Sequence, residues 1–144
     1  MIIAGPGVQQ GAICKKPVQL LDIYPTLLEL SGLKADSLHE GNSLVELLRN
    51  PDEEWPHFAR TSFGPGNYAI ISEQYKYIRY NDGSEEFYDH FKDPNEWYNL
   101  IENEDYSVEI EQHRKQVPVN PHKVLGENST GHKAFDAAEK KARR

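Results

Sequence analysis

The 144-residue sequence predicts a mixed α+β fold, and three observations support this. Residues 17–33 have the apolar spacing of an amphipathic helix. Residues 57–100 contain short aromatic and β-branched runs between glycine, proline and asparagine turns, a pattern typical of antiparallel strands. Residues 104–116 then read as a mostly charged helix. The length suits one domain with one core.

The first unit, residues 1–50, is expected to begin with a strand. Met1–Ala4 is short and apolar and runs into Gly5-Pro6-Gly7, as at the end of a buried strand that meets a turn. Because the chain opens inside this strand, we expect the start of the original domain to be missing.

The same unit is predicted to contain two helices. In residues 17–33, Asp22 is placed as the N-cap and Gly32 as a left-handed C-terminal residue. A short second helix is predicted after Gly41, with leucines on one face and an end at Asn50-Pro51. The apolar stripe of the first helix is too wide for the preceding strand to cover, so self-association through this face is expected.

The second unit, residues 51–116, is expected to hold a four-stranded antiparallel sheet and the charged helix. Asp82-Gly83 is a strong hairpin signal, because glycine accepts the positive φ of the turn. Trp97 and Leu100 are predicted to clamp the following turn onto the sheet, and Arg79 to face Glu86 across the hairpin. The predicted strands are 57–62, 68–72, 75–80 and 86–88.

The third unit, residues 117–144, contains Pro118, Pro121, Gly126 and Gly131, few residues that could be buried, and a basic end. It predicts a frayed or extended polar tail.

Composition excludes several classes of function. The net charge of −7 argues against nucleic acid and anionic membranes as general partners. No apolar run has the roughly 20 residues of a membrane span, and no signal peptide is visible, so the compartment stays unknown. Cys14 is the only cysteine, which excludes an intramolecular disulfide and a cysteine-rich zinc site; it is interpreted as a structural thiol.

Candidate metal-binding side chains have no ligand spacing. The six histidines are scattered and are interpreted as surface or capping residues. Between Asp82 and Glu111 there are eleven acidic residues and one lysine. A solvated acidic face is the favoured interpretation, and a site for a cation or a basic partner is the alternative.

Two segments carry a resemblance to a known family. The run KYIRYNDGSEEFYDHFKDPNEWYNL, residues 76–100, resembles the C-terminal strand pair of the sulfatases, specifically the iduronate-2-sulfatase-like branch of the alkaline-phosphatase-like superfamily. The run IIAGPGV followed by CxxPVxLLDIYPTLLELSGL is similar to the last strand and helix of the sulfatase α/β domain. The resemblance covers roughly residues 2–101.

The resemblance implies a parent enzyme that hydrolyses sulfate esters, expected to be those of a sulfated carbohydrate, and that is periplasmic or secreted. Family members use a formylglycine made from Cys or Ser in a Cys/Ser-x-Pro-x-Arg motif, and a calcium ion. No such motif occurs in this sequence. Calcium and formylglycine are therefore expected only in an N-terminal part, and this chain is expected to have no cofactor, no catalytic residue and no activity alone.

The resemblance also suggests one substrate-facing loop, Gly64-Pro65-Gly66-Asn67-Tyr68. Many relatives have histidine where Tyr68 stands, which puts a histidine-specific sugar contact in doubt. Asn67, Tyr68 and Arg60 are the candidate substrate-binding residues. The alternative, favoured for Tyr68, is a glycine-rich turn with its ring in the sheet packing, and for Arg60 an exposed strand charge. A different class of function, an independent glycan- or protein-binding module, also stays open.

Overall fold

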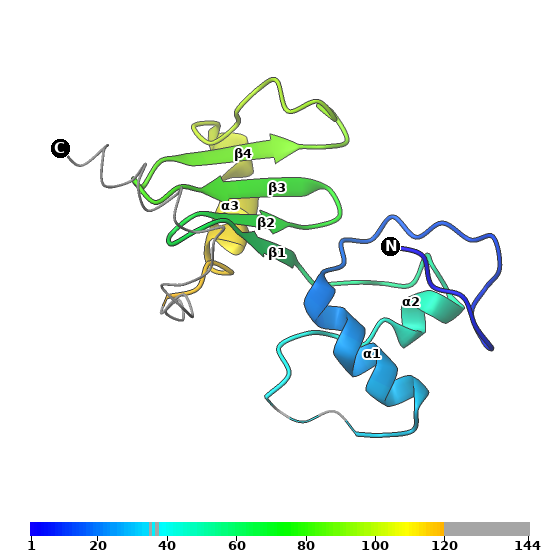
Figure 1. Cartoon of the computed structure of the whole chain (residues 1–144). Helices are drawn as coiled ribbons and strands as arrows, with labels where there is room; N and C mark the ends of the chain where they lie inside the picture. Colours follow the sequence, from blue (N-terminus) through cyan, green and yellow to red (C-terminus); the bar gives the residue numbers. More distant parts are fainter. Residues whose placement is uncertain (35, 37, 120–144) are drawn as a thin grey trace.

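A computed structural model describes residues 1–34, 36 and 38–119. The chain forms an antiparallel sheet with helix α3 across one of its faces, and a second part in which α1 and α2 lie beside long loops (Figure 1). The predicted α+β class is confirmed.

The first helix is shorter than predicted. A 3₁₀ turn, η1, covers Leu20–Asp22, and α1 covers Ile23–Leu30 with Asp22 at its N-cap position. The helix cannot begin at Pro17, because Gln19 is still extended, with φ −129° and ψ 164°. Gly32 has φ +71°, and the amide of Leu33 donates to the carbonyl of Leu28 at 2.8 Å. This is the predicted left-handed C-terminal cap.

Helix α2, Val45–Arg49, confirms the second predicted helix. Leu44 and Leu47 are buried with Trp55 in a small apolar cluster. The indole nitrogen of Trp55 donates to the carbonyl of Pro17 at 2.9 Å, which ties the segment before the sheet to the segment before α1.

The strand predicted at Met1–Ala4 is wrong. These residues form no strand in the structure, and Ile2 is 97% exposed. A buried strand needs a neighbouring strand to satisfy its backbone groups, and no described residues pair with this segment.

The four predicted strands are confirmed with small changes in their bounds. They are β1 Ala59–Ser62, β2 Tyr68–Ile71, β3 Tyr75–Arg79 and β4 Glu85–Asp89, in the order β1-β2-β3-β4 and all antiparallel. The predicted charged helix is present as η2, Glu104–Tyr106, followed by α3, Ser107–Arg114.

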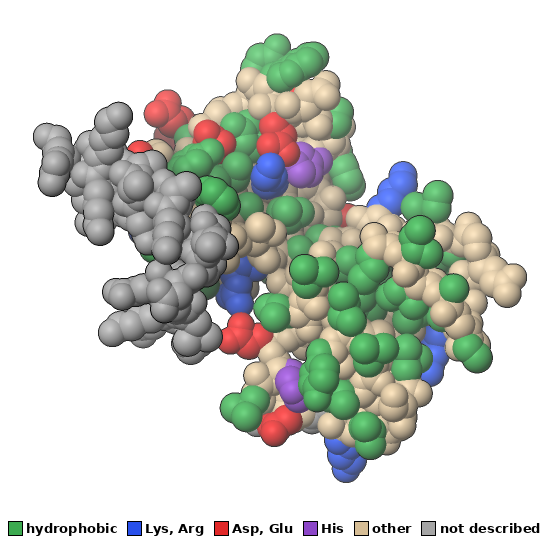
Figure 2. All heavy atoms as spheres, viewed as in Figure 1, with side chains coloured by type: hydrophobic (Ala, Val, Ile, Leu, Met, Phe, Trp, Pro, Cys, Tyr) green, Lys and Arg blue, Asp and Glu red, His purple; other side chains and the backbone are tan. Residues whose placement is uncertain are grey.

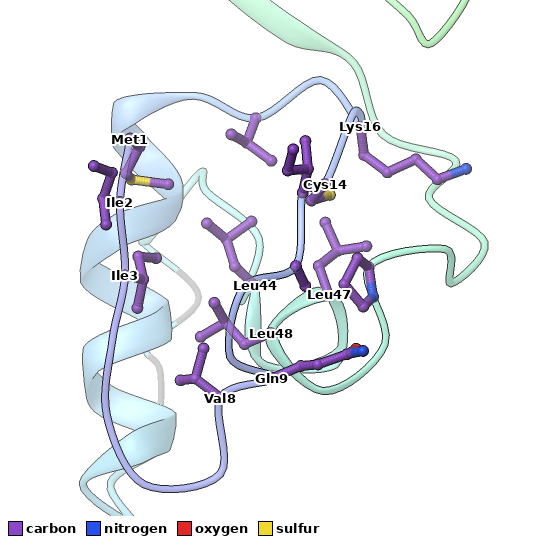
Figure 3. Close-up of a pocket in the computed structure, with 14 residues that line it drawn as sticks. Met1, Ile2, Ile3, Val8, Gln9, Cys14, Lys16, Leu44, Leu47 and Leu48 are labelled. Carbon is purple, nitrogen blue, oxygen red and sulfur yellow. The ribbon is translucent and has the colours of Figure 1, made fainter.

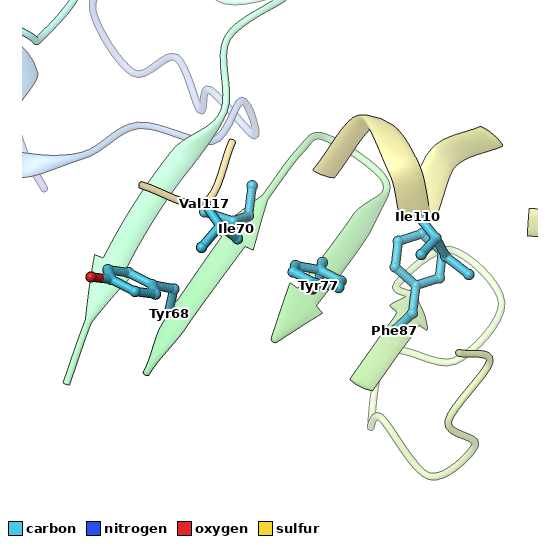
Figure 4. Packing of buried hydrophobic residues seen from close by; sticks show 6 residues of the cluster. All are labelled: Tyr68, Ile70, Tyr77, Phe87, Ile110 and Val117. Carbon is cyan, nitrogen blue, oxygen red and sulfur yellow. The ribbon is translucent and has the colours of Figure 1, made fainter. Parts of the chain in front are cut away.

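The main core lies between the sheet and α3. The register places Tyr77 between Ile70 and Phe87 on neighbouring strands, and all three are fully buried. Ile110 of α3 and Val117 complete the layer (Figure 4). Of the predicted polar tail, Val117 is thus buried, while residues 120–144 lie outside the described residues.

Two predicted side-chain positions around the hairpin are wrong. Arg79 lies opposite Glu85 rather than Glu86, because the strand pair is shifted by one residue. Trp97 is 74% exposed and does not clamp the turn; Leu100 does, since it packs against the core and its amide donates to the carbonyl of Phe87 at 2.8 Å.

His113, interpreted from the sequence as a surface or capping residue, is only 2% exposed. It lies in the second-last position of α3, on the helix face that packs against the aromatic rings of Phe58 and Phe87.

Candidate functional site

The loop of residues 63–67 joins β1 to β2 and packs against the β3–β4 turn. Gly66 has φ +80°, and a Cβ atom built on it would lie 3.0 Å from the Cβ of Asn81. Only glycine therefore fits both the backbone conformation and the close approach. The two turns lie side by side where the strands end, and this end is called the edge of the sheet below.

Asn67 holds this edge together. The side-chain nitrogen of Asn67 donates to the backbone carbonyl of Phe63 at 2.9 Å. Its side-chain oxygen accepts from the backbone amide of Asn81 at 3.1 Å. The side chain thus links both turns, and its position is fixed by the fold.

Tyr68 begins β2 and lies on the α3 face of the sheet, next to Ile70. Its ring is 9% exposed and belongs to the main core. In Figure 4 its hydroxyl points toward β1, away from the other five labelled side chains. The ring therefore packs as a sheet residue, and the hydroxyl is the only polar group it presents at the sheet margin.

Arg60 shares this face of the sheet, since it lies opposite Ile70, two residues from Tyr68. Its guanidinium forms an ion pair with Glu40 at 3.0 Å, and its backbone amide donates to the side-chain oxygen of Gln19 at 3.1 Å. The structure thus brings Asn67 and Tyr68 together, while Arg60 connects the sheet to the loops around α1.

A second polar network supports the same edge from α3. Arg114 donates to both carboxylate oxygens of Glu85, at 3.1 and 2.7 Å, and Glu85 also accepts from the hydroxyl of Tyr77. The bond from Arg114 holds the pKa of the Glu85 carboxyl below its usual value, although burial opposes this. Burial and the Glu85 carboxylate raise the pKa of Tyr77 to about 12.

The opposite face of the sheet carries a cluster that the sequence did not single out. Lys76 donates to both oxygens of Glu96, at 3.0 and 2.8 Å, and a ring nitrogen of His90 lies 2.9 Å from Glu96. Burial raises the pKa of Glu96, but the bonds to Lys76 and His90 outweigh it and the pKa is lowered. Glu96 also has φ +57°, which is uncommon for a residue with a side chain.

An apolar hollow of about 400 Å³ lies between the N-terminal segment and α2 (Figure 3). Ile3, Val8, Leu44 and Leu48 point into it in the view shown. Cys14 stands at its border and is exposed, so it is not the packed structural thiol that the sequence suggested.

The residues described in the structure offer no metal centre, because no three His, Cys, Asp or Glu side chains among them come together. None of the described helices is long and apolar enough to cross a membrane.

Comparison with known proteins gives a consistent result. The family described as N-sulphoglucosamine sulphohydrolase, C-terminal, matches residues 1–120. A sulfatase of Formosa agariphila is 42% identical over 82% of this chain and 23% of its own length. A Delta 4,5-hexuronate-2-O-sulfatase of Bacteroides thetaiotaomicron is 34% identical over 78% of this chain and 26% of its own length.

Solved structures agree. A 2-O GAG sulfatase superposes with a TM-score of 0.61 and 29% identity, over 78% of this chain and 27% of that one. A structure in complex with its substrate D-glucosamine-2-N,6-O-disulfate superposes with a TM-score of 0.54 and 26% identity, over 65% of this chain and 22% of that one. The chain spans about a quarter of the length of the curated relatives it matches. With the sheet, its helix and residues 1–120 all matched, the chain belongs to the N-sulphoglucosamine sulphohydrolase C-terminal family, a C-terminal domain of sulfatases.

Proposed function

We propose that this chain acts as the C-terminal part of a sulfatase that hydrolyses sulfate esters of a carbohydrate. The observation that carries the proposal is the family match over residues 1–120. Two similar proteins support the substrate class: one is a Delta 4,5-hexuronate-2-O-sulfatase, and one solved structure is in complex with a disulfated glucosamine.

The proposed role of the chain is structural and substrate-facing rather than catalytic. The sequence has no Cys/Ser-x-Pro-x-Arg motif, and no three His, Cys, Asp or Glu side chains of the described residues come together as a metal site. Formylglycine and calcium, the groups that supply the nucleophile and polarise the sulfate in the resembling family, are therefore assigned to the remainder of the parent enzyme. Alone, the chain is expected to be inactive.

Two apolar surfaces support contact with that remainder. Helix α1 leaves Ile23, Tyr24, Leu27 and Leu30 exposed, and the hollow of Figure 3 is lined by further apolar side chains. In Figure 2, hydrophobic side chains cover much of the half of the molecule that contains α1 and α2. Burial of apolar surface in such a contact would stabilise the association by roughly 25 cal/mol per Å².

The candidate contacts Asn67, Tyr68 and Arg60 are proposed to form one wall of the substrate pocket. Asn67 fixes the loop, while the Tyr68 hydroxyl and the Arg60 guanidinium offer a donor and a charge. A donor and a cation suit the hydroxyl and sulfate groups of a sugar.

A chimera tests the function. Residues 1–119 replace the matching segment of the Formosa agariphila relative, and hydrolysis of sulfated oligosaccharides is measured with calcium present. We expect turnover by the chimera and none by the relative lacking this segment. The isolated chain, assayed with an aryl sulfate and calcium, should give no saturable turnover. A folded chimera with no activity on any sulfate ester, or turnover by the isolated chain, would refute the proposal.

Within an active chimera, Arg60→Gln and Tyr68→Phe test the wall. Each is expected to raise KM about threefold to tenfold with little change in kcat, as for loss of one ground-state contact. Thr61→Ala, at an exposed strand position between the loop and Arg60, is the matched control and should leave KM unchanged.

A further inference from the structure

A second pocket, separate from the edge described above, lies between three segments: the approach to β1, the β2–β3 turn and α3. Its volume is about 270 Å³. The approach to β1 contributes aromatic side chains, and the turn and α3 contribute carboxylates. Neither the proposed substrate wall nor the ion pairs of the sheet include this pocket.

Aromatic rings form much of its lining. Trp55 and His57 meet edge to face with centroids 4.5 Å apart, and Phe58 meets His113 edge to face at 5.0 Å. Tyr75 also lines the pocket and stacks on the core residue Phe87 with centroids 5.3 Å apart. The rings are therefore held in place by packing. Ring faces carry negative potential, which attracts cations.

The charges of the lining have one sign. Glu73 and Glu109 both line the pocket, and no lysine or arginine does so among the described residues. Glu73 forms an ion pair with Lys16, whose ammonium lies 2.7 Å from one carboxylate oxygen. The Glu109 carboxylate has no hydrogen-bond or ion-pair partner in the described part of the chain.

His113 adds no positive charge to the pocket. Its Nδ1 lies 2.7 Å from the carbonyl oxygen of Glu109, which can only accept, so Nδ1 carries the hydrogen. Its Nε2 lies 3.0 Å from the hydroxyl of Ser72, which can donate to a bare nitrogen. Burial lowers the pKa of His113, in agreement with a neutral ring.

From the aromatic rings of the lining, the unpaired Glu109 carboxylate and the absence of a lysine or arginine among the described lining residues, we propose that this pocket binds a small organic cation of the alkylammonium class. Ring faces and carboxylates both stabilise such a cation, and its methyl groups fit an aromatic lining. The same charges repel a sulfate group, so the pocket is not a second site for the substrate of a sulfatase. The inference does not depend on the proposed function.

The test uses two ligands of one shape. Choline and its uncharged isostere 3,3-dimethyl-1-butanol are titrated into the full chain at pH 8, above the ordinary histidine pKa of about 6.5. Binding is followed by the fluorescence of Trp55 in a Trp97→Phe background, since Trp97 is exposed. We expect choline to bind in the millimolar range or better, at least about tenfold tighter than the alcohol.

Variants locate the site. Glu109→Gln is expected to weaken choline binding about fivefold to tenfold, because it removes the unpaired charge. Glu102→Gln, at an exposed position outside the pocket, is the matched control and should change it less than twofold. If Glu109→Gln fails to fold, Glu73→Gln takes its place. Equal affinity for the two ligands, no binding of choline up to about 50 mM, or equal loss in Glu109→Gln and Glu102→Gln would overturn the proposal.

Discussion

At the scale of single residues, the acidic side chains of the second half of the chain are less solvated than their number suggests. Asp89 is fully buried and accepts from the amide of Phe91 at 3.0 Å and from the side chain of Gln74 at 3.1 Å. Glu85 forms an ion pair with Arg114, and Glu96 forms one with Lys76. A buried carboxylate is tolerated when its lone pairs are satisfied, so these residues are part of the fold.

His113 makes the stability of the chain depend on pH. Burial lowers its pKa in the folded state, so the unfolded chain binds more protons below the ordinary value of about 6.5. The stabilising effect of the neutral ring is complete above that pH and is lost as the pH falls toward the folded-state pKa. Urea unfolding at pH 8, 7, 6 and 5 should therefore show a falling free energy of unfolding over the lower part of this range.

NMR titration of the imidazole of His113 checks the same point directly. The expected result is a pKa below about 6.5. A value at or above it, together with constant stability between pH 7 and 5, would contradict the assignment.

Arg114 is expected to stabilise the contact between α3 and the sheet through its two bonds to Glu85. Arg114→Ala should lower the free energy of unfolding by about 1–2 kcal/mol, because charge-assisted bonds are lost and Glu85 stays half-buried. Arg79→Ala is the matched control: Arg79 lies opposite Glu85 but is exposed, and its loss should cost less than about 0.5 kcal/mol. Equal losses in the two variants, measured by urea unfolding, would be evidence against a special role for Arg114.

At the scale of elements, turn chemistry decides how the sheet ends. The 63–67 loop and the β3–β4 turn both contain a glycine with positive φ, but the surroundings of the two glycines differ. Gly66 faces Asn81, whereas a Cβ on Gly83 would meet nothing within 4 Å. Substitutions at Gly66 and Gly83 therefore distinguish the cost of backbone strain, which both positions carry, from the cost of a close contact, which only Gly66 carries.

Gly66→Ala is therefore expected to destabilise the chain more than Gly83→Ala. Both variants carry the cost of a left-handed residue, about 1 kcal/mol, and Gly66→Ala adds the displacement of the Asn81 turn. Thermal unfolding of both variants measures the difference. The same loss of stability in both variants would show that the 63–67 loop can move away from Asn81 at no cost in free energy.

At the scale of the whole molecule, the α1–α2 part exposes an apolar face that nothing described in the structure covers. Leu27 is 56% exposed, and Tyr24 and Leu30 are similar. Exposed apolar patches of this kind promote association. The isolated chain is therefore expected to self-associate through α1.

Leu27→Lys should reduce this association, because it places a charge in the apolar stripe. Glu29→Lys, an exposed residue of the same helix, is the matched control for added positive charge. Light scattering over a range of protein concentrations measures the effect. If the chain without substitutions is monomeric at every concentration, the proposal that this face drives association is contradicted.

The sequence by itself determined the α+β class, the four strands and the C-terminal cap at Gly32, because strand periodicity and turn glycines are local signals. Local signals also placed residues 63–67 as a loop between two strands, whereas the family resemblance made this loop, with Asn67 and Tyr68, a candidate to face the substrate. They did not place His113 in the core or Trp97 in solvent, since both require knowing which face of an element is covered.

Only the tertiary structure decided what faces what. The register set Arg79 against Glu85, and α3 carried Arg114 to the same carboxylate across 29 residues. Segments far apart in sequence formed the pocket of Glu73, Glu109 and Trp55. The physical reason is that a charge or a ring acts over a few ångströms of space, and sequence spacing gives that distance only within one helix turn or one strand pair.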